Sequence, residues 1–376
     1  MLSYPLEEDF VEGRFLERVN RFVIKAKIAG KEAFAYLPNP GRLWELLIKG
    51  RKLLLLSRSS SHSSLKYLTF AVKKEDLWVL LHTHYTNRVV SALIKEGNIP
   101  ELKGYRVLKR EPKFNSSRFD LLLESPSGER LFLEVKTCTL FGKRGAMFPD
   151  APSKRATRHL LHLEKLPEGT KGAIFFAVMS PDVDYFLPAY HIDPEFAEVF
   201  LKAYKNIRVF AYGFKWSRDF RRVEALKSLK LPIELLKKEF KNSGSYLLVL
   251  YLEKEEWIEK FGRSFAPGYY VYVGSAMKNL KQRIARHMRK RKKLKWHIDY
   301  FLAKAKLEKA VPILSSKRLE CTLARDVSSI SEGYIPKFGS SDCSCASHLF
   351  YFSRNPLLNE NFQELLVYYR IDRLFE

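Results

Sequence analysis

The sequence predicts an α/β protein with several domains, because its hydrophobic pattern changes character twice along 376 residues. Residues 1–82 contain short apolar runs separated by Gly, Pro and Ser, which is typical of a small β-domain. Residues 83–233 alternate strand-like and helix-like segments, as in layered α/β folds. A second such pattern covers residues 244–376, and we expect residues 234–243 to form the linker before it.

The N-terminal region has five runs with the length and composition of strands. They are Arg21–Ile28, Lys31–Leu37, Lys52–Ser57, Tyr67–Val72 and Leu77–His82. Five short strands favour a closed barrel of the oligonucleotide-binding (OB) type, with another small β-domain as the alternative.

The two later regions each combine apolar strands with amphipathic or basic helices. In residues 83–233 we expect helices at Asn87–Lys95, Lys154–Leu166 and Glu195–Tyr204, and strands at Phe119–Glu124, Leu131–Lys136, Ala173–Ser180 and Ile207–Tyr212. In residues 244–376 we expect strands at Ser245–Leu252 and Tyr269–Gly274, then helices at Leu280–Lys293 and Trp296–Lys306.

The charge of the chain favours a polyanionic partner. The formal net charge is +24, which suits either nucleic acid or an anionic membrane surface. Apolar runs such as Leu53–Leu56 are far too short to cross a membrane. The N-terminus carries Glu7, Glu8 and Asp9 instead of a signal pattern. We therefore expect a cytoplasmic protein that binds DNA and no membrane, and the sequence leaves its oligomeric state open.

Three charged residues lie at one end of an otherwise apolar hairpin. Asp120 precedes one apolar run, Glu134 and Lys136 belong to the next, and Ser125–Gly128 between them is favourable for a turn. A hairpin symmetric about Ser127 places Asp120 directly across from Glu134. Glu134 and Lys136 share a face, because side chains alternate along a strand.

Buried carboxylates are costly unless a cation compensates them, and Mg²⁺ or Mn²⁺ would do so at Asp120 and Glu134. Such a site suits phosphodiester hydrolysis, with Lys136 orienting or activating the attacking water. Glu111 is a candidate third metal ligand. The alternative is an ordinary salt-bridged hairpin.

Four segments carry a resemblance that extends over residues 1 to about 233. They are Pro38–Arg42, Ser117–Asp120, Glu134–Thr137 and Ala146–Leu160. In these segments the chain resembles the sugar fermentation stimulation protein A family. The resemblance implies an OB-like barrel followed by a PD-(D/E)xK nuclease-like domain. It also implies DNA binding and a regulatory role in sugar metabolism.

The last of these segments predicts a helix with a basic face. Ser153 is a suitable N-cap residue for a helix that begins at Lys154. That helix would carry one stripe of four residues: Arg155, Arg158, His159 and His162. The stripe either contacts DNA phosphates or is a solvated face. Arg42 is a further candidate DNA contact.

The C-terminal region contains a second ordered set of polar residues. Tyr246 follows Gly244 at the start of one strand, and Tyr272 precedes Gly274 in the next. Arg283 and His287 are four residues apart on the predicted basic helix, so they share a face, and Glu320 lies beyond the second helix.

This order resembles the GIY-YIG endonuclease superfamily over residues 243–355. The stretch Phe338–Phe350 is similar to an uncharacterised prokaryotic branch of that superfamily. The resemblance implies that Tyr246 or Tyr272 activates or orients water, and that Arg283 holds the scissile phosphate. It also implies that His287 assists and that Glu320 binds the metal. A divergent, inactive DNA-binding relative is the alternative.

Two further clusters accompany this set. The segment Arg289–Lys295 has six cations in seven positions, and we expect it to extend the helix of Arg283 and to contact DNA. Its candidate contacts are Arg289, Arg291, Lys292 and Lys293. Cys321, Cys343, Cys345 and His348 are either a zinc site or buried thiols, while Cys138 is expected in the core.

Taken together, the sequence predicts a DNA-binding protein with metal-dependent, endonuclease-like activity. One site would use Asp120, Glu134 and Lys136, and the other would be the GIY-YIG-like set. A non-catalytic DNA-binding regulator of sugar metabolism genes is the alternative.

Overall fold

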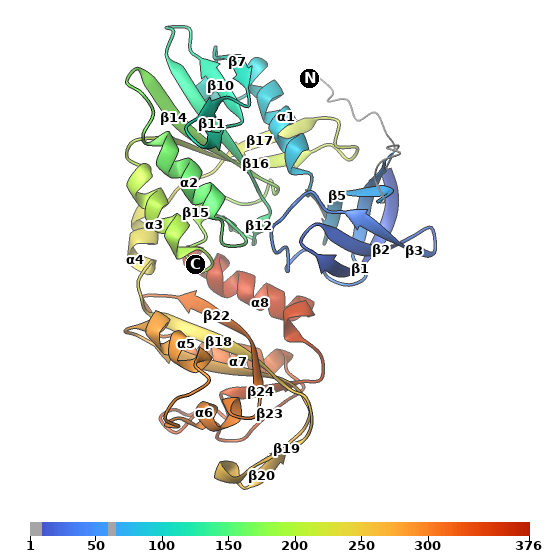
Figure 1. The fold of residues 1–376 in the computed structure, drawn as a ribbon, viewed down its shortest axis with the longest axis vertical. Coiled ribbons are helices and arrows are strands. Elements are labelled where there is room, and N and C mark those ends of the chain that lie inside the picture. Colours follow the sequence, from blue (N-terminus) through green and yellow to red (C-terminus); the bar gives the residue numbers. More distant parts are fainter. Residues whose placement is uncertain (1–9, 59–64) are drawn as a thin grey trace. The chain divides into compact units, whose positions relative to one another are not determined.

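The computed structural model of the chain describes residues 10–58 and 65–376, and it divides into two compact units (Figure 1). The first unit extends to Ile233 and the second begins at Glu234. The acidic residues Glu7, Glu8 and Asp9 lie outside the described residues. In the part of the chain that is described, no helix is long and apolar enough to cross a membrane.

The first unit begins with a closed five-stranded barrel, as predicted. Its strands are β1 (Phe10–Asn20), β2 (Val23–Ile28), β3 (Lys31–Tyr36), β4 (Lys52–Ser57) and β5 (Tyr67–Lys74). They run in the order β3-β2-β1-β4-β5, and parallel pairing of β3 with β5 closes the barrel. The predicted barrel strand Leu77–His82 corresponds to β6 (Leu77–Leu80), which pairs with β5 outside this closure.

Strand β1 is absent from the sequence prediction. Of its eleven residues only Gly13 and Phe15 are fully buried, and Glu12, Arg14 and Glu17 point to solvent or the barrel rim. The apolar residues of β1 occur mostly as adjacent pairs and do not alternate with polar ones, so the strand has no clear alternating signal. Its pairing with both β2 and β4 holds it in the barrel.

A six-stranded mixed sheet follows in the same unit, with the order β17-β16-β14-β11-β10-β7. Its strands are β7 (Arg106–Arg110), β10 (Leu121–Glu124), β11 (Arg130–Cys138), β14 (Thr170–Val178), β16 (Arg208–Trp216) and β17 (Val223–Ser228). β11, β14 and β16 are parallel neighbours and most of their residues are buried, as expected for strands covered on both faces.

Helices and short strands complete this unit. The helices are α1 (Thr83–Lys95), η1 (Pro100–Leu102), α2 (Lys154–Leu163) and α3 (Pro194–Ala203). α1 packs on β11 and β7, whereas α2 packs on β14 and α3 (Figure 1). β12 (Leu140–Phe141), β13 (Gly145–Phe148) and β15 (Tyr185–Pro188) form a small sheet, and β8 (Lys113–Phe114) pairs with β9 (Ser117–Arg118).

The second unit is built on a five-stranded antiparallel sheet in the order β22-β18-β21-β24-β23. The strands are β18 (Gly244–Leu252), β21 (Gly268–Ala276), β22 (Lys306–Leu314), β23 (Gly333–Tyr334) and β24 (Leu349–Phe352). A separate hairpin joins β19 (Glu256–Ile258) and β20 (Arg263–Phe265).

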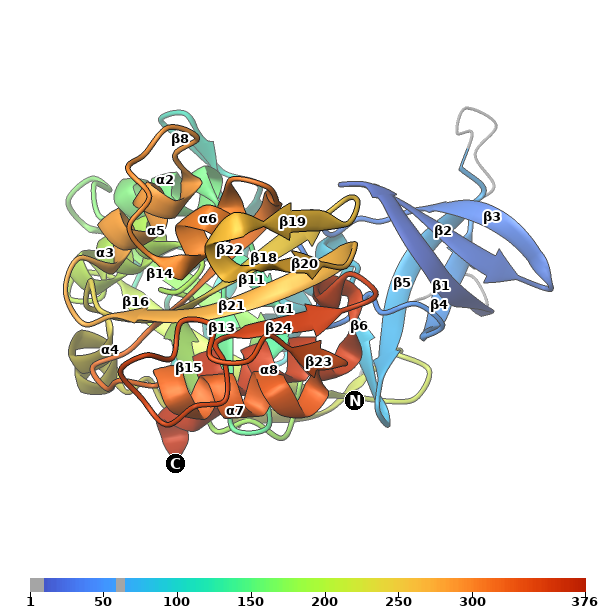
Figure 2. The ribbon, with the colours of Figure 1, turned by 90° about the horizontal axis from the view of Figure 1, so that it is seen from below.

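Helices contact this sheet along β18, β21 and β22 (Figure 2). The helices that follow β21 in the sequence are α5 (Leu280–Met288), α6 (His297–Leu302), α7 (Glu320–Ile330) and α8 (Glu360–Arg370), and the short turns are η2 (Glu259–Phe261), η3 (Pro356–Leu358) and η4 (Asp372–Phe375). α5 packs on β18 and β21, α7 on β21, and α8 on β22. β18 lies between β22 and β21 and is packed by α5, and it is almost entirely buried.

Helix α4 (Ile233–Glu239) covers much of the segment 234–243, which was expected to be the linker, and the boundary between the two units falls at its start. One local expectation is wrong. The basic helix ends at Met288 and not at Lys293, so Arg289–Lys295 is an irregular loop. Arg286 accounts for this end, because it turns to Asp299 and also donates to the carbonyl of Lys293, at 2.9 Å.

Candidate functional site

The hairpin of β10 and β11 has the register that the sequence predicts. Leu121 pairs with Leu133, and the next position along the ladder brings Asp120 opposite Glu134. Asp120 itself lies one residue before the paired part of β10. One of its oxygens accepts from the backbone N–H of Val135 at 2.7 Å, and the other accepts from the side-chain amide of Asn87 at 2.6 Å.

Glu134 is the more buried carboxylate, with 2% of its surface exposed. Its Oε1 atom accepts from the ammonium of Lys136 and lies 2.6 Å from Nδ1 of His159. Its Oε2 atom is buried and has no hydrogen-bond partner among the described residues. Burying a carboxylate oxygen without a hydrogen-bond partner costs free energy, so we expect this atom to bind a ligand.

The two carboxyl groups differ in their electrostatics. Burial, with the nearby charge of Glu134, raises the pKa of Asp120 from 3.8 to about 7. Burial also acts to raise the pKa of Glu134, but the charge of Lys136 and the hydrogen bond with His159 outweigh it and leave that pKa below 4.5. Without a bound cation, Glu134 is therefore anionic near neutral pH, whereas Asp120 is protonated in part.

These residues line a cavity of about 290 Å³. Its wall combines segments that lie far apart in the sequence: Asn39–Gly41 from the barrel, Asn87 from α1, Asp120 with Glu134–Thr137, and Met147–Ala156 around the start of α2. All four segments that carry the sequence resemblance thus contribute to one wall. Arg21, Arg118 and Arg155 add positive charge around it.

The barrel loop in this wall is fixed by buried polar groups. The guanidinium of Arg18 donates to the carbonyl oxygens of Gly41, at 2.5 Å, and Arg42, at 2.6 Å. A side chain at position 41 would collide with Asp150, because a Cβ atom there would lie 2.2 Å from its Oδ2 atom. Gly41 therefore allows the barrel loop and the segment before α2 to approach each other closely.

Other predicted residues of the first unit have more varied positions. Glu111 lines the cavity but is exposed and pairs with Arg118 at 3.1 Å. Arg155 lines the cavity, and Arg158 is exposed on α2. Arg42 does not line the cavity; its guanidinium stacks on Trp44, 5.2 Å from the ring centroid. Ser153 caps α2 as predicted, accepting from the N–H of Ala156 at 3.2 Å.

His159 is the residue that sequence reasoning placed wrongly. It is 1% exposed and faces Glu134, so it cannot belong to a solvent-facing basic stripe. The spacing of Ala156, Leu160 and Leu163 on the helix already marks the buried face, and position 159 lies on that face. His162 is half-buried, and its Nδ1 atom lies 2.8 Å from Ser117 Oγ.

In the second unit, the predicted polar set converges beside β18 and β21. The Tyr246 hydroxyl lies 2.9 Å from Nε2 of His287, and its ring centroid lies 6.4 Å from that of Tyr272. Gly274 makes this possible, because a Cβ atom there would lie 2.5 Å from the Tyr246 ring. Gly274, two residues after Tyr272, thus leaves the space that the ring of Tyr246 fills.

The ionisation states around Tyr246 follow from burial. Burial lowers the pKa of His287 to about 4, with a further contribution from the charge of Lys292. Burial raises the pKa of Tyr246 and of Tyr272 far above 10. A neutral imidazole and a neutral phenol result, and Nε2 of His287 can accept the Tyr246 proton.

Arg283 and Glu320 complete this cluster. The charge of Arg283 partly opposes the effect of burial on the pKa of Tyr246, and its guanidinium lies 4.3 Å from the ring centroid of Trp296. The hydroxyl of Ser275 donates to Glu320 at 2.6 Å. Burial alone would raise the pKa of Glu320, but His348 and the Ser275 hydrogen bond hold it below 4.5.

The basic loop after α5 is exposed except at one position. Arg289, Arg291 and Lys293 face solvent. Lys292 does not, because its ammonium donates to the carbonyl of His287 at 2.8 Å and lies 3.8 Å from the buried Asp299. Its predicted role as a DNA contact therefore competes with a role in the domain interior.

Cys138 of the first unit is buried, as expected for a core residue.

Comparison with known families assigns almost the whole chain. Residues 16–81 match the SfsA N-terminal OB domain, and residues 84–220 match the sugar fermentation stimulation protein RE domain. Residues 245–370 match a domain of unknown function, DUF123.

Individual relatives agree with this division. A sugar fermentation stimulation protein homolog of Methanothermobacter thermautotrophicus is 36% identical over 214 residues, which are 56% of this chain and 89% of the relative. The homolog of Pyrobaculum islandicum is 37% identical over 240 residues, 62% of this chain and 99% of the relative. The structure of Pyrococcus furiosus SfsA in complex with Ca²⁺ is similar with a TM-score of 0.56 and 29% identity, over 61% of this chain and 99% of that one. The chain therefore belongs to the sugar fermentation stimulation protein family, and it carries a GIY-YIG-like DUF123 domain after the region that defines the family.

Proposed function

We propose that the first unit hydrolyses phosphodiester bonds of DNA with the help of a divalent cation held by Asp120 and Glu134. The observation that carries this proposal is the buried Oε2 atom of Glu134, which has no hydrogen-bond partner among the described residues and belongs to a residue that lines a cavity with Asp120. A structural salt bridge does not explain that atom, because Lys136 and His159 both bind the other oxygen.

The donor set fits Mg²⁺ or Mn²⁺. Both carboxylates offer hard oxygen ligands, and each oxygen of Asp120 has one lone pair free beside its existing hydrogen bond. Glu111, exposed at the rim, is a further candidate ligand. When bound, such a cation supplies charge neutralisation at the phosphate and lowers the pKa of a coordinated water. The relative from Pyrococcus furiosus is in complex with Ca²⁺, which has the same preference for oxygen ligands.

The surrounding residues of the chain provide the remaining functions. Lys136 is held by Glu134, so its ammonium is fixed at the cavity, where it can orient an attacking water. Arg155, in the first turn of α2, can bind a phosphate oxygen, and the helix N-terminus also favours an anion there. His159 is a positioning residue, because it fixes the orientation of Glu134 from inside the protein.

The second unit supports a second candidate site of the same reaction class. Its carrying observation is the Tyr246–His287 contact next to Arg283 and Glu320. His287 would accept a proton through Tyr246, Arg283 would hold the phosphate and Glu320 would bind a cation. We propose that this GIY-YIG-like site acts independently of the first, since each unit contains its own set of groups.

DNA is the partner that fits the charge of the chain. The net charge is +24, and Arg289, Arg291 and Lys293 are exposed in the loop after α5. The competing proposal is a DNA-binding regulator without catalysis. It would require the carboxylates of Asp120 and Glu134 to face phosphates with no cation between them, which is electrostatically unfavourable.

Nicking of supercoiled plasmid in Mg²⁺ or Mn²⁺ tests both sites. The proteins are the wild type, Asp120→Asn, Arg283→Ala and the double variant. Each single variant should lose one cleavage activity by about 10²–10³-fold, and the double variant should lose both. Glu168→Gln is the matched control in the first unit, because this exposed carboxylate does not line the cavity and its loss should change cleavage little. Binding should survive all of these changes, since many cations contribute to it.

The outcomes separate the alternatives. If wild type binds DNA and cleaves no DNA form with either cation, the regulator proposal replaces the nuclease. If one single variant abolishes all cleavage, the two sites are coupled or only one of them works.

A further inference from the structure

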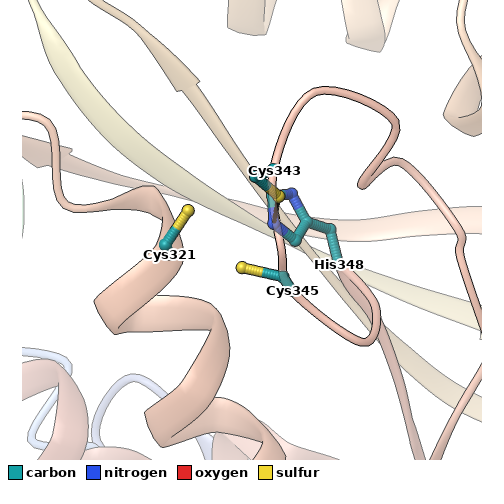
Figure 3. A group of neighbouring side chains, drawn as sticks. All are labelled: Cys321, Cys343, Cys345 and His348. Atoms are coloured by element: carbon teal, nitrogen blue, oxygen red, sulfur yellow. Dashed lines mark hydrogen bonds between the residues drawn. The ribbon is translucent and has the colours of Figure 1, made fainter.

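Four potential metal ligands from two distant segments meet in the second unit. Cys321 lies in the first turn of α7, and Cys343, Cys345 and His348 lie in the loop that leads into β24 (Figure 3). Their sulfur and nitrogen atoms all lie within 4.8 Å of one another. The three thiols are free, so no disulfide accounts for their proximity.

The chemistry of this group matches zinc better than any other common biological cation. Thiolate and imidazole are soft or intermediate ligands that Mg²⁺ and Ca²⁺ avoid, whereas Cys₃His is a standard tetrahedral zinc set. With Zn–S bonds of about 2.3 Å, sulfur atoms in a tetrahedral site lie roughly 3.8 Å apart. Separations of up to 4.8 Å therefore need only small side-chain rotations to close on the ion. His348 Nε2 already lies 3.5 Å from the sulfur of Cys343.

The loop itself gives a physical reason for a metal. Between Gly339 and Ala346 it forms no strand or helix, and most of its residues are polar or small and at least partly exposed. Such a segment buries too little apolar surface to offset the entropy of ordering its backbone. A metal bound to Cys343 and Cys345 would cross-link the loop to Cys321 on α7 and supply that stabilisation.

We propose that Cys321, Cys343, Cys345 and His348 bind one Zn²⁺, and that His348 connects this ion to Glu320. On binding, the three thiols release their protons to solvent and the ion takes three sulfur ligands and Nε2 of His348. The site is closed, with four protein ligands, so it is structural and not a second hydrolytic centre.

The link to Glu320 follows from the other ring nitrogen. Nδ1 of His348 is buried, makes no hydrogen bond within the described residues, and lies 3.6 Å from Oε1 of Glu320. Metal-bound histidines usually donate their second N–H to a carboxylate, which fixes the ring and strengthens the ligand. Zinc binding would therefore orient Glu320, the carboxylate expected to hold the catalytic cation of this unit. Only this last consequence rests on the proposed nuclease function.

Metal content of the purified full-length protein is the first test. Elemental analysis should find one zinc per chain, and Co²⁺ exchanged into the site should give the visible absorption of tetrahedral cobalt–thiolate. Cys343→Ser and Cys321→Ser should lose the metal. Cys321 is exposed, so its replacement does not disturb the core. Cys138→Ser is the matched control, because it removes the one remaining cysteine and should retain full occupancy.

Three results would overturn the zinc site. One is a wild-type protein that neither contains zinc nor takes up Zn²⁺ or Co²⁺ when its thiols are reduced. Another is a Cys321→Ser variant with unchanged metal content. The third is a disulfide between Cys321 and a loop cysteine, which thiol titration would detect. Adding a chelator should speed up the amide hydrogen exchange of residues 335–348 in wild type. The same treatment should leave the exchange rate of Cys343→Ser unchanged, because this variant holds no metal.

Glu320→Gln tests the connection to the carboxylate without any reference to cleavage. Loss of a carboxylate partner of a ligating histidine should weaken zinc affinity by about 10–100-fold. An unchanged affinity would refute the link while leaving the four-ligand site intact. Failure of plasmid cleavage would refute the nuclease proposal and leave both zinc measurements unaffected.

Discussion

Replacing Asp120 with asparagine should stabilise the metal-free protein at alkaline pH. The substitution keeps the shape of the side chain and removes a half-buried charge beside Glu134. An asparagine at this position can still accept from the N–H of Val135, and the amide of Asn87 can turn to face it. The change therefore removes mainly charge.

The magnitude follows from the pKa of Asp120, which is raised from 3.8 to about 7. At about 1.4 kcal/mol per pH unit, ionising this group in the folded protein costs as much as about 4 kcal/mol. The cost is absent below the unfolded pKa, grows as the pH rises from about 4 to 7, and is complete above 7. Imperfect hydrogen bonds of the asparagine subtract about 1 kcal/mol. The variant should thus be more stable than wild type by about 3 kcal/mol at pH 8 and less stable by about 1 kcal/mol at pH 4.

Scanning calorimetry of the full chain in chelator measures this difference. For a unit of this size, about 3 kcal/mol corresponds to an increase in Tm of roughly 6–12 °C. Mg²⁺ or Mn²⁺ at about 100 times its Kd should raise the stability of wild type by about 2.7 kcal/mol and that of the variant by little. Glu168→Gln is the control, because that carboxylate is exposed outside the cavity and its loss should leave Tm unchanged at both pH values.

Two outcomes would refute this reasoning. A variant that is less stable than wild type at pH 8 in chelator would show that the charge of Asp120 is not costly in the fold. Equal stabilisation of wild type and variant by the divalent cation would show that Asp120 is not a ligand.

Three further predictions concern DNA binding and the support of the two sites. Affinity for DNA should fall on the order of 10³-fold between low and moderate salt, as measured by fluorescence anisotropy; salt-independent binding would exclude phosphate contacts as the main source. His159→Ala should lower the free energy of unfolding by about 1–3 kcal/mol in urea titrations, because it removes a buried partner of Glu134, whereas His159→Gln should lower it less. Gly274→Ala should reduce cleavage by the second unit about 10²-fold in the Asp120→Asn background, since the new Cβ displaces Tyr246; full retention of that activity would count against Tyr246.

Much of the fold could be predicted because its signals are local. Alternating or continuous apolar runs bounded by turn residues identified four strands of the barrel, and also β18 and β21 of the second unit. The turn at Ser125–Gly128 was enough to set the register that brings Asp120 opposite Glu134. Strand β1 escaped prediction, because its burial comes from neighbours on both sides and not from its own composition.

Side-chain direction was decided by packing between distant segments. His159 turns toward Glu134, 25 residues away in the sequence, and Lys292 turns toward Asp299 instead of solvent. Charge alone predicts exposure for such residues, and only a buried partner reverses that preference.

By itself, the sequence determined the type and order of the domains, the pairing of Asp120 with Glu134, and the residues of the Tyr, Arg, His and Glu set. The tertiary structure alone decided that the barrel loop at Gly41 and the segment at Asp150 close one wall around those carboxylates. It also decided that Cys321 meets Cys343, Cys345 and His348. The physical reason is that turns and periodic burial act between near neighbours in the chain, whereas close approach of remote segments depends on how complete elements pack.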